Sequence, residues 1–273
     1  EGTQAGIYDL SLINLQITAG DDADYVGGIA GWVSDAVLEG CHVQGHITGG
    51  NFSDFYGGLC GFFDSGSMRE CDVDIKITSA DNCDLHGGLF GFGQHVLIED
   101  SEAHIELISA NQASDHGGLG GRLFFATLRN FSAKGTVTVG DYGYNIGGLN
   151  GVINYTLLQD GASNVNVTGG NNNNTIAGCI GDIATSRVFN SSFSGEISVE
   201  DHSGNVGGFV GYVDKSRIED CVAIGDITTG ESPLAVGGFC GTLEGQTLTR
   251  NFASGTVKAG TQGQYIGGFV GGV

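Results

Sequence analysis

The stretch DYVGGIAGWV, residues 24–33, places three glycines inside an apolar run that otherwise has the character of a β-strand. Glycine in a strand interior is destabilising and normally has a local cause, such as a bulge or the close approach of another backbone. The same cluster returns every 30 residues, nine times in all, with Ala177 in place of the first glycine of the sixth copy. The first three copies are Gly27, Gly28 and Gly31, then Gly57, Gly58 and Gly61, then Gly87, Gly88 and Gly91. Fixed self-similarity of this length marks a repeat array.

The repeats share columns of apolar residues when they are aligned on the glycines. In the segment HVQGHIT, residues 42–48, side chains alternate with the two-residue period of a half-buried strand, and no segment keeps helical spacing. Further apolar columns begin at Tyr8 and Ile13, so both side chains are expected to point inward. One column is aliphatic throughout: Ile17, Ile47, Ile77, Leu107, Val137, Val167, Ile197, Ile227 and Val257. The sequence predicts an all-β fold, a single-stranded parallel β-helix (β-solenoid) of nine coils with about three short strands per 30-residue coil, forming one domain over residues 1–273.

Charges and glycines give further detail of the stacking. Glu39, Arg69, Glu99 and Arg129 share one column of four successive repeats, so opposite charges alternate as expected for directly opposed neighbours. The apolar columns before and after the glycine pair are three residues apart, and only a bend at the pair turns both inward. Because alanine resists positive φ, Ala177 indicates that the first glycine serves a close backbone approach. The second glycine is then the expected site of unusual backbone dihedrals.

The chain is strongly acidic, with 31 acidic and 10 basic residues and a formal charge of −21. Nucleic acids and anionic lipids select for lysine and arginine, so neither is an expected partner. No apolar stretch of about 20 residues occurs, which argues against direct membrane insertion. The seven cysteines include no CxxC pair, which excludes the common structural zinc patterns. Cys41 and Cys71 share a column, as buried thiols or as a disulfide between adjacent coils.

The GG-L/I/F-x-G pattern ends a unit that carries an xGxIT strand, and in this combination the sequence resembles the GLUG-motif repeat of bacterial surface proteins, including adhesin-like proteins and immunoglobulin A proteases. The resemblance covers all nine units. It implies a non-catalytic segment, located outside the cell or on its surface, and it supplies no active-site residue.

Polar residues gather in the loop before each glycine cluster. They include Asp21, Asp24, Asp54, Asp81 and Asp84. Stacked oxygen ligands of this kind could hold Ca²⁺, the one cofactor that the sequence leaves open. The alternative is a column of turn residues, because Asp and Asn tolerate left-handed backbone and close their own turns.

Two histidines, His86 and His116, also share a column, next to Asp115 and near Asp84 in the sequence. One interpretation is a metal site of two histidines and a carboxylate. The other is a pair of histidines at the edge of the core, because the same column is aliphatic or aromatic in the other repeats.

An apolar stripe follows the glycine pair, and the bend would leave it on the outside. Its members are Trp32, Phe62, Phe90, Phe92, Val152, Ile180, Val210 and Tyr212, with Cys60 and Cys240 in the same columns. An exposed patch of this kind marks contact with a partner. We expect another protein domain or a second copy to bind through this stripe or through the solenoid ends, with a host surface or a glycan as further ligands. The alternative is a bulge elsewhere that turns these residues inward.

Three functions fit this reading. The first is a non-catalytic structural or adhesive repeat domain of an extracellular or cell-surface protein, acting as a spacer, an assembly unit or a binding surface. The second is a carbohydrate-active β-helix enzyme, but the acids recur column by column and no long loop interrupts the array, so no catalytic residue is assigned. The third is an ice-binding face built on Thr18, Thr48, Thr78, Thr138, Thr168 and Thr228.

Overall fold

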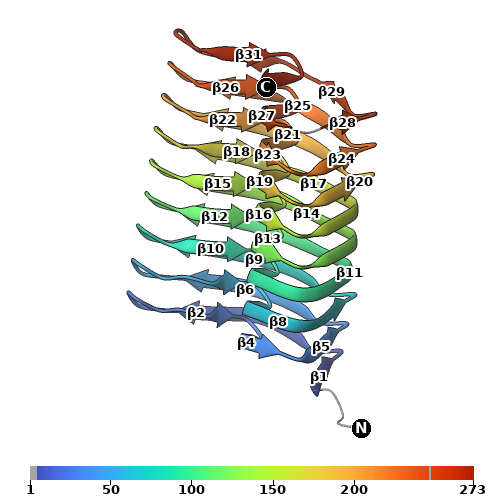
Figure 1. Cartoon of the computed structure of the whole chain (residues 1–273). Coiled ribbons are helices and arrows are strands. Elements are labelled where there is room, and N and C mark those ends of the chain that lie inside the picture. The colour runs from blue at the N-terminus through green and yellow to red at the C-terminus, as the bar shows by residue number, and fades with distance from the viewer. Residues whose placement is uncertain (1–4, 246) are drawn as a thin grey trace.

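The computed structural model describes residues 5–245 and 247–273, so residues 1–4 and 246 of the predicted domain lie outside the described residues. All regular structure in these ranges is β-strand. The strands form coils that stack along one axis (Figure 1), and their pairings are parallel. Equivalent residues of adjacent repeats are direct neighbours, as Val43 pairs with Val73 and Ile47 with Ile77. The predicted parallel β-solenoid is confirmed.

One sheet of nine short strands lies before the glycine pairs. Its strands are β3 (Val26–Gly27), β7 (Tyr56–Gly57), β10 (Asp84–Gly87), β12 (Ser114–Gly117), β15 (Tyr144–Gly147), β18 (Thr175–Ala177), β22 (Asn205–Gly207), β26 (Ala235–Gly237) and β31 (Tyr265–Gly267).

A second sheet of 23 strands wraps around the rest of each coil. The strands that follow the glycine pairs are β4 (Ala30–Ser34), β8 (Cys60–Arg69), β11 (Phe90–Ser109), β13 (Gly120–Phe124), β16 (Asn150–Asn154), β19 (Ile180–Ala184), β23 (Val210–Asp214), β27 (Cys240–Glu244) and β32 (Val270–Gly272). Next along the coils are β1 (Ala5–Tyr8), β5 (Ala36–Glu39), β14 (Thr127–Val139), β17 (Leu157–Gly169), β20 (Arg187–Phe189), β24 (Arg217–Glu219) and β28 (Leu248–Thr249). The coils are completed by β2 (Ser11–Thr18), β6 (His42–Thr48), β9 (Asp72–Ser79), β21 (Ser192–Val199), β25 (Val222–Thr229), β29 (Phe252–Ser254) and β30 (Val257–Lys258). The apolar run that carries the glycine cluster, expected as one strand of each coil, is therefore divided into two strands at the glycine pair.

The core lies inside the coils and follows the predicted columns. Leu38, Val43, Ile47, Leu59 and Phe63 come from one turn of the chain and are all fully buried. Full burial of one such side chain contributes roughly 1.5–3 kcal/mol, whereas an exposed ion pair contributes about 0–1 kcal/mol. The stacked apolar columns therefore hold the fold together far more than its surface charges do.

The glycine pair forms a corner too tight for side chains. A Cβ on Gly57 would collide with the carbonyl oxygen of Cys60, and a Cβ on Gly58 would collide with that of Gly88 in the next coil. The close approach predicted for the first glycine is confirmed. The prediction of unusual dihedrals at the second glycine is wrong, because positive φ among glycines is confined to Gly40, Gly135, Gly245 and Gly255 in the described ranges. Backbone crowding selects both glycines of the pair.

The other corners turn on single left-handed residues, of which Gly40 and Gly245 are glycines and most of the rest are not. Phe52, Phe55, Tyr142 and Tyr155 all have φ between 50° and 61°. The left-handed region of backbone dihedrals is unfavourable for bulky residues. Hydrogen bonds between coils hold the corners in place: the N–H of Phe52 donates to Asp81 O at 3.1 Å, and that of Tyr142 donates to Asn171 O at 2.9 Å. The corners therefore display aromatic side chains on the surface.

The first coil departs from the predicted register. Residues 5–12 pair with residues 36–43, and a bulge between Leu12 and Leu15 restores the regular spacing. Ile7 and Leu12 therefore pack against the core, whereas Tyr8 is 57% exposed and Ile13 is 64% exposed. The inward orientation predicted for Tyr8 and Ile13 is wrong because the bulge adds one residue to this coil.

The seven cysteines are buried free thiols. Burial raises the pKa of Cys71, Cys221 and Cys240 to about 12. Of the two states expected for Cys41 and Cys71, the structure contains the thiols.

Candidate functional site

The predicted apolar stripe divides into a buried part and a surface part. Phe90, Ile180 and Val210 are fully buried, and Val152 is 5% exposed, so their prediction as surface residues is wrong. For Phe90, Ile180 and Val210 the cause is the third glycine of each cluster, whereas Val152 follows that glycine and lies in the outer column of Phe92 and Arg122. Pairing between β8 and β11 joins Phe90 to Cys60 and Phe92 to Phe62 but skips the glycines between them. The backbone at this glycine lies against the preceding strand, which breaks the alternation and turns the position before it inward.

An aromatic strip remains on the surface of the first three coils. It comprises Tyr25, Trp32, Phe55, Phe62 and Phe92. Trp32 and Phe62 have ring centroids 4.6 Å apart, and Phe62 stacks on Phe92 at 5.1 Å with 14° between the planes. Tyr25 stacks on Phe55 at 4.7 Å. Trp32 is 55% exposed.

The rings of the aromatic strip form two stacked pairs, Tyr25 on Phe55 and Phe62 on Phe92, and the two pairs are inclined to one another by 61–76°. Phe62 and Phe92 are paired residues of adjacent coils, so their stacked faces look along the solenoid axis at one another. The stacked rings offer apolar area to a partner.

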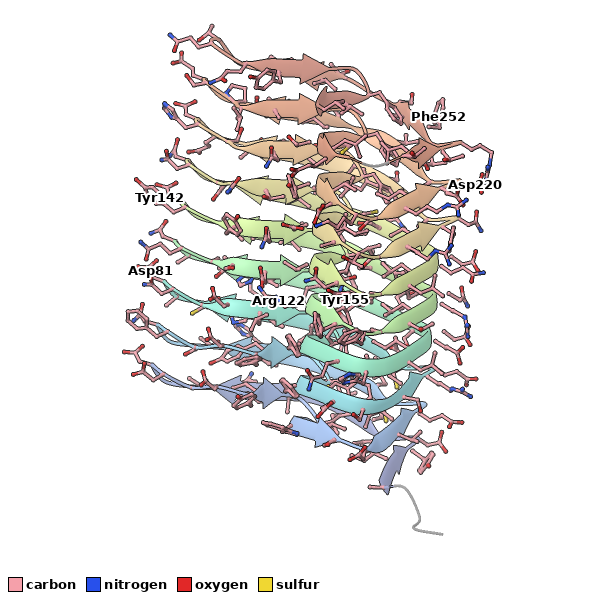
Figure 2. The ribbon with its side chains drawn as sticks, in the orientation of Figure 1. Asp81, Arg122, Tyr142, Tyr155, Asp220 and Phe252 are labelled. Atoms are coloured by element: carbon pink, nitrogen blue, oxygen red, sulfur yellow. The ribbon has the colours of Figure 1, made fainter. Side chains whose placement is uncertain are left out.

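The strip ends in the fourth coil at an ion pair between a half-exposed arginine and a buried carboxylate. Arg122 occupies the column of Phe62 and Phe92 and pairs with Asp115, which is 2% exposed and also accepts a hydrogen bond from Asn145 Nδ2 at 2.9 Å. Figure 2 places Arg122 on the face between the two rows of corners. Tyr212, the remaining member of the predicted stripe, lies farther along this face and donates to Glu244.

A second aromatic group forms the corner beside this face. His95 stacks on Phe125 at 5.4 Å, and Phe125 stacks on Tyr155 at 4.8 Å. Phe125 and Tyr155 are about half exposed, and both are left-handed corner residues. This group was not predicted, because the residue types in its column differ between coils. The 30-residue spacing of His95, Phe125 and Tyr155 is the signal that could have identified it.

Three aspartates, Asp24, Asp54 and Asp84, directly precede the strip in consecutive coils; we call them the aspartate rim. Asp24 Oδ1 accepts the N–H of Asp54 at 3.2 Å, and Asp54 Oδ1 accepts that of Asp84 at 2.9 Å. Burial raises the pKa of Asp54, with Asp24 adding to the effect. Burial, followed by the charges of Asp54 and Asp115, raises the pKa of Asp84 to about 6.

The column of Asp21 and Asp81 is a hydrogen-bonded ladder at the loop tips. Asp21 Oδ1 accepts the N–H of Asn51 at 2.7 Å, and Asp81 Oδ1 accepts that of Asn111 at 2.8 Å. The column reads Asp21, Asn51, Asp81, Asn111, Asp141, Asn171 and Asp201, so acid and amide alternate. No group of three or more His, Cys, Asp or Glu side chains is arranged as a metal site in residues 5–245 and 247–273. This geometry favours the turn interpretation of the column, and Ca²⁺ binding stays a prediction.

The opposite corners carry a second alternating ladder. Asn130 Nδ2 donates to Asp100, and Asn190 Nδ2 donates to Asp160, each at 2.5 Å. Arg250 then makes two bonds of 2.6 Å to Asp220. Figure 2 shows Asp81 and Asp220 on opposite edges of the stack. From Asp21 to Asn171 and from Asp100 to Arg250, each acid is followed in the next coil by an amide or a cation, whereas Glu70–Asp100 and Asp201–Glu231 are adjacent acids at the ends of the two ladders.

His86 and His116 lie in the core. Both are fully buried, with ring centroids 4.5 Å apart, and Tyr56 stacks on His86 from the other side. Burial lowers the pKa of both histidines, that of His116 to about 4. The geometry favours the core interpretation over a metal site.

A charged hollow of about 510 Å³ lies over β9, β11 and β14. Its polar lining comes from Glu70, Asp72, Asp74, Asp100, Glu102, His104 and Lys134. The charges pair across coils: His42 with Asp72 at 2.5 Å, His104 with Asp74 at 3.3 Å and Lys134 with Glu102 at 2.5 Å. This charged hollow was not predicted from the sequence. The signal that could have identified it is the mixed charge of these columns, which is replaced by Asn164 and Ser194 in later coils.

Comparisons with known proteins give one match. The family model of the GLUG motif matches residues 202–228, the repeat that contains Gly207 and Gly208. No curated protein and no solved structure matches the chain. In the described residues, no helix is long and apolar enough to span a membrane. Fold and motif together make this chain a β-solenoid repeat domain with a GLUG repeat.

Proposed function

We propose that this β-solenoid is a non-catalytic binding segment of an extracellular or cell-surface protein. The observation that carries the proposal is the aromatic strip, an apolar surface held on a rigid stack and bordered by aspartates that have no ion-pair partner among the described residues. Apolar surface of this kind is destabilising to display unless a partner covers it. The GLUG repeat at residues 202–228 supports the surface location through the resemblance described above.

Surface location is tested on intact cells of the source organism with an antibody against the purified solenoid. We expect labelling of intact cells and loss of the epitope after brief external protease treatment. Labelling that requires permeabilised cells would contradict the proposed location.

A carbohydrate-active enzyme is the second candidate, and the charged hollow is the observation that favours it. The paired state of Asp72, Asp74 and Glu102 argues for the non-catalytic proposal, because each carboxylate already faces a basic side chain. Incubation with acidic and neutral polysaccharides, followed by reducing-end and unsaturated-product assays, separates the two. Product formation that disappears in Asp74→Asn would establish the enzyme.

A further inference from the structure

The aspartate rim is a run of three acids in consecutive coils, whereas the other columns of the solenoid hold adjacent acids in pairs at most. From Asp21 to Asp201 and from Asp100 to Asp220, acids in one ladder are two coils apart, about 10 Å, and acids of adjacent coils occur in these columns only as the single pairs Glu70–Asp100 and Asp201–Glu231. The two-coil separation is close to the Debye length at 0.1 M salt, so salt screens much of the repulsion across it. In the rim, by contrast, Asp24, Asp54 and Asp84 occupy three consecutive coils. Like charges directly opposed on neighbouring strands are destabilising.

Nothing in the described part of the chain neutralises the rim fully. Arg122 is the cation that acts on Asp84, but its guanidinium is already paired with buried Asp115. The rim carboxylates accept backbone N–H groups of the next coil, which fixes their positions without supplying positive charge. Departures from an otherwise consistent design concentrate at functional sites.

The rim and the aromatic strip together define the chemistry of a partner. Asp24 directly precedes Tyr25, and Asp54 directly precedes Phe55, so the carboxylates border the apolar rings. A second copy would bring like-charged rims together, and anionic membranes and nucleic acids would be repelled. A neutral glycan would leave the charge of the rim unpaired. Apolar side chains flanked by lysine or arginine complement both features.

We propose that the aromatic strip and the aspartate rim form a docking site for a basic protein segment, whose apolar side chains pack on the strip while its lysine or arginine side chains pair with Asp24, Asp54 and Asp84. This inference rests on the proposed function and names the chemistry of its partner. Docking would relieve the repulsion within the rim and cover the exposed Tyr25 and Trp32 and the half-buried phenylalanines at the same time.

Trp32 makes the test specific, because it is the sole tryptophan of the chain and lies in the strip. The probe is a short peptide of alternating lysine and leucine, titrated into the full chain while Trp32 emission is followed. We expect a saturable blue shift that weakens as salt is raised. Peptides of alternating glutamate and leucine, or of lysine and serine, should produce no shift.

A matched pair of variants separates the rim from overall charge. The triple variant Asp24→Asn, Asp54→Asn, Asp84→Asn should weaken binding by roughly tenfold or more, which corresponds to about 1.4 kcal/mol. The control Asp81→Asn, Asp141→Asn, Asp201→Asn removes the same charge from an alternating ladder and should bind within about twofold of the parent. Asparagine keeps the oxygen that accepts the backbone N–H, so both variants should fold.

Three outcomes would overturn the inference. They are equal weakening in the two triple variants, binding of the glutamate peptide, and a Ca²⁺-dependent rise in thermal stability that the rim variant alone loses, which would make the rim a cation site. If the rim variant does not fold, Phe62→Ser must abolish the blue shift for the proposal to stand. Labelling of intact cells tests the proposed function separately, because a surface protein could lack this docking site.

Discussion

The imidazole rings of His86 and His116 stack 4.5 Å apart inside the solenoid, and neither ring nitrogen of His116 has a hydrogen-bond partner among the described residues. Burial without a partner disfavours the charged imidazolium, which is why the pKa of His116 falls to about 4. The folded protein then binds fewer protons than the unfolded chain between pH 4 and pH 6.5. This contribution to stability is present above the unfolded pKa and is lost as the pH falls toward 4.

His116→Phe should therefore stabilise the protein at acidic pH. Phenylalanine fits a column that holds Tyr56 in an earlier coil. Each pKa unit corresponds to 1.36 kcal/mol, so we expect a gain of roughly 3 kcal/mol at pH 4 relative to pH 7. Urea unfolding at several pH values measures it, with His202→Gln as a control. A variant with the same pH dependence as the parent would contradict a neutral buried histidine.

Asp84→Asn should have the opposite pH dependence. The pKa of Asp84 is raised to about 6, so the folded state binds more protons than the unfolded chain between pH 3.8 and pH 6. Its contribution to stability falls as the pH rises through this range. We expect the substitution to stabilise by about 1 kcal/mol at pH 7, a value reduced for the partial exposure of the group, and to be neutral near pH 4. Melting temperatures at the two pH values measure this, and a loss of stability at pH 7 would contradict it.

Gly58→Ala should destabilise severely, because its Cβ would meet the carbonyl oxygen of Gly88. We expect a loss of about 3 kcal/mol or more, the range of backbone strain that cannot relax. Gly20→Ala is the matched control, since open space surrounds that position. Equal denaturation midpoints for the two variants would show that the corner is looser than the structure indicates.

Phe90 and Phe92 test the division of the apolar stripe, because they lie two residues apart on β11. Phe90→Ser places a hydroxyl in the core and should cost about 3 kcal/mol or more. Phe92→Ser removes an outer ring stacked on Phe62 and should cost about 1 kcal/mol. Chemical denaturation of both variants gives the comparison. If Phe92→Ser were the more destabilising substitution, Phe90 would have to lie on the surface.

Asn111→Asp tests whether the alternation of acid and amide in the ladder limits charge repulsion between coils. It would create three consecutive acids with Asp81 and Asp141. We expect a loss of about 0.5–1 kcal/mol at low salt that shrinks at high salt. Asn111→Ser, which adds no charge, serves as the control. A loss that is independent of salt would point to the hydrogen bonds of Asn111 rather than to charge.

The repeat made most of the fold predictable. Ile47 and Val43 are inward because their columns are apolar in nearly every unit, and the pairing of Glu99 with Arg69 and Arg129 follows from the predicted register. The bulge in the first coil was not predictable in this way, because Tyr8 and Ile13 extend apolar columns as well as Ile7 and Leu12 do.

The candidate site was only partly predictable. Trp32, Phe62 and Phe92 were identified from their apolar column, but Phe90 was placed on the same face because strand alternation takes no account of a skipped glycine. The rim aspartates were identified as polar loop residues. The sequence alone did not single out their three consecutive acids. The difference becomes clear only beside the ladders of Asp81 and Asp100, where the structure shows acids bonded to groups of the next coil.

Because acid and amide alternate along the ladders, the solenoid can change length by two coils without placing acids side by side. A change of one coil would bring two acids together. Deleting one coil between Asp81 and Asp141 would place two acids in contact, whereas deleting two would leave every acid beside an amide. Natural variants of this domain should accordingly gain or lose repeats in even numbers along the stretch from Asp21 to Asp201.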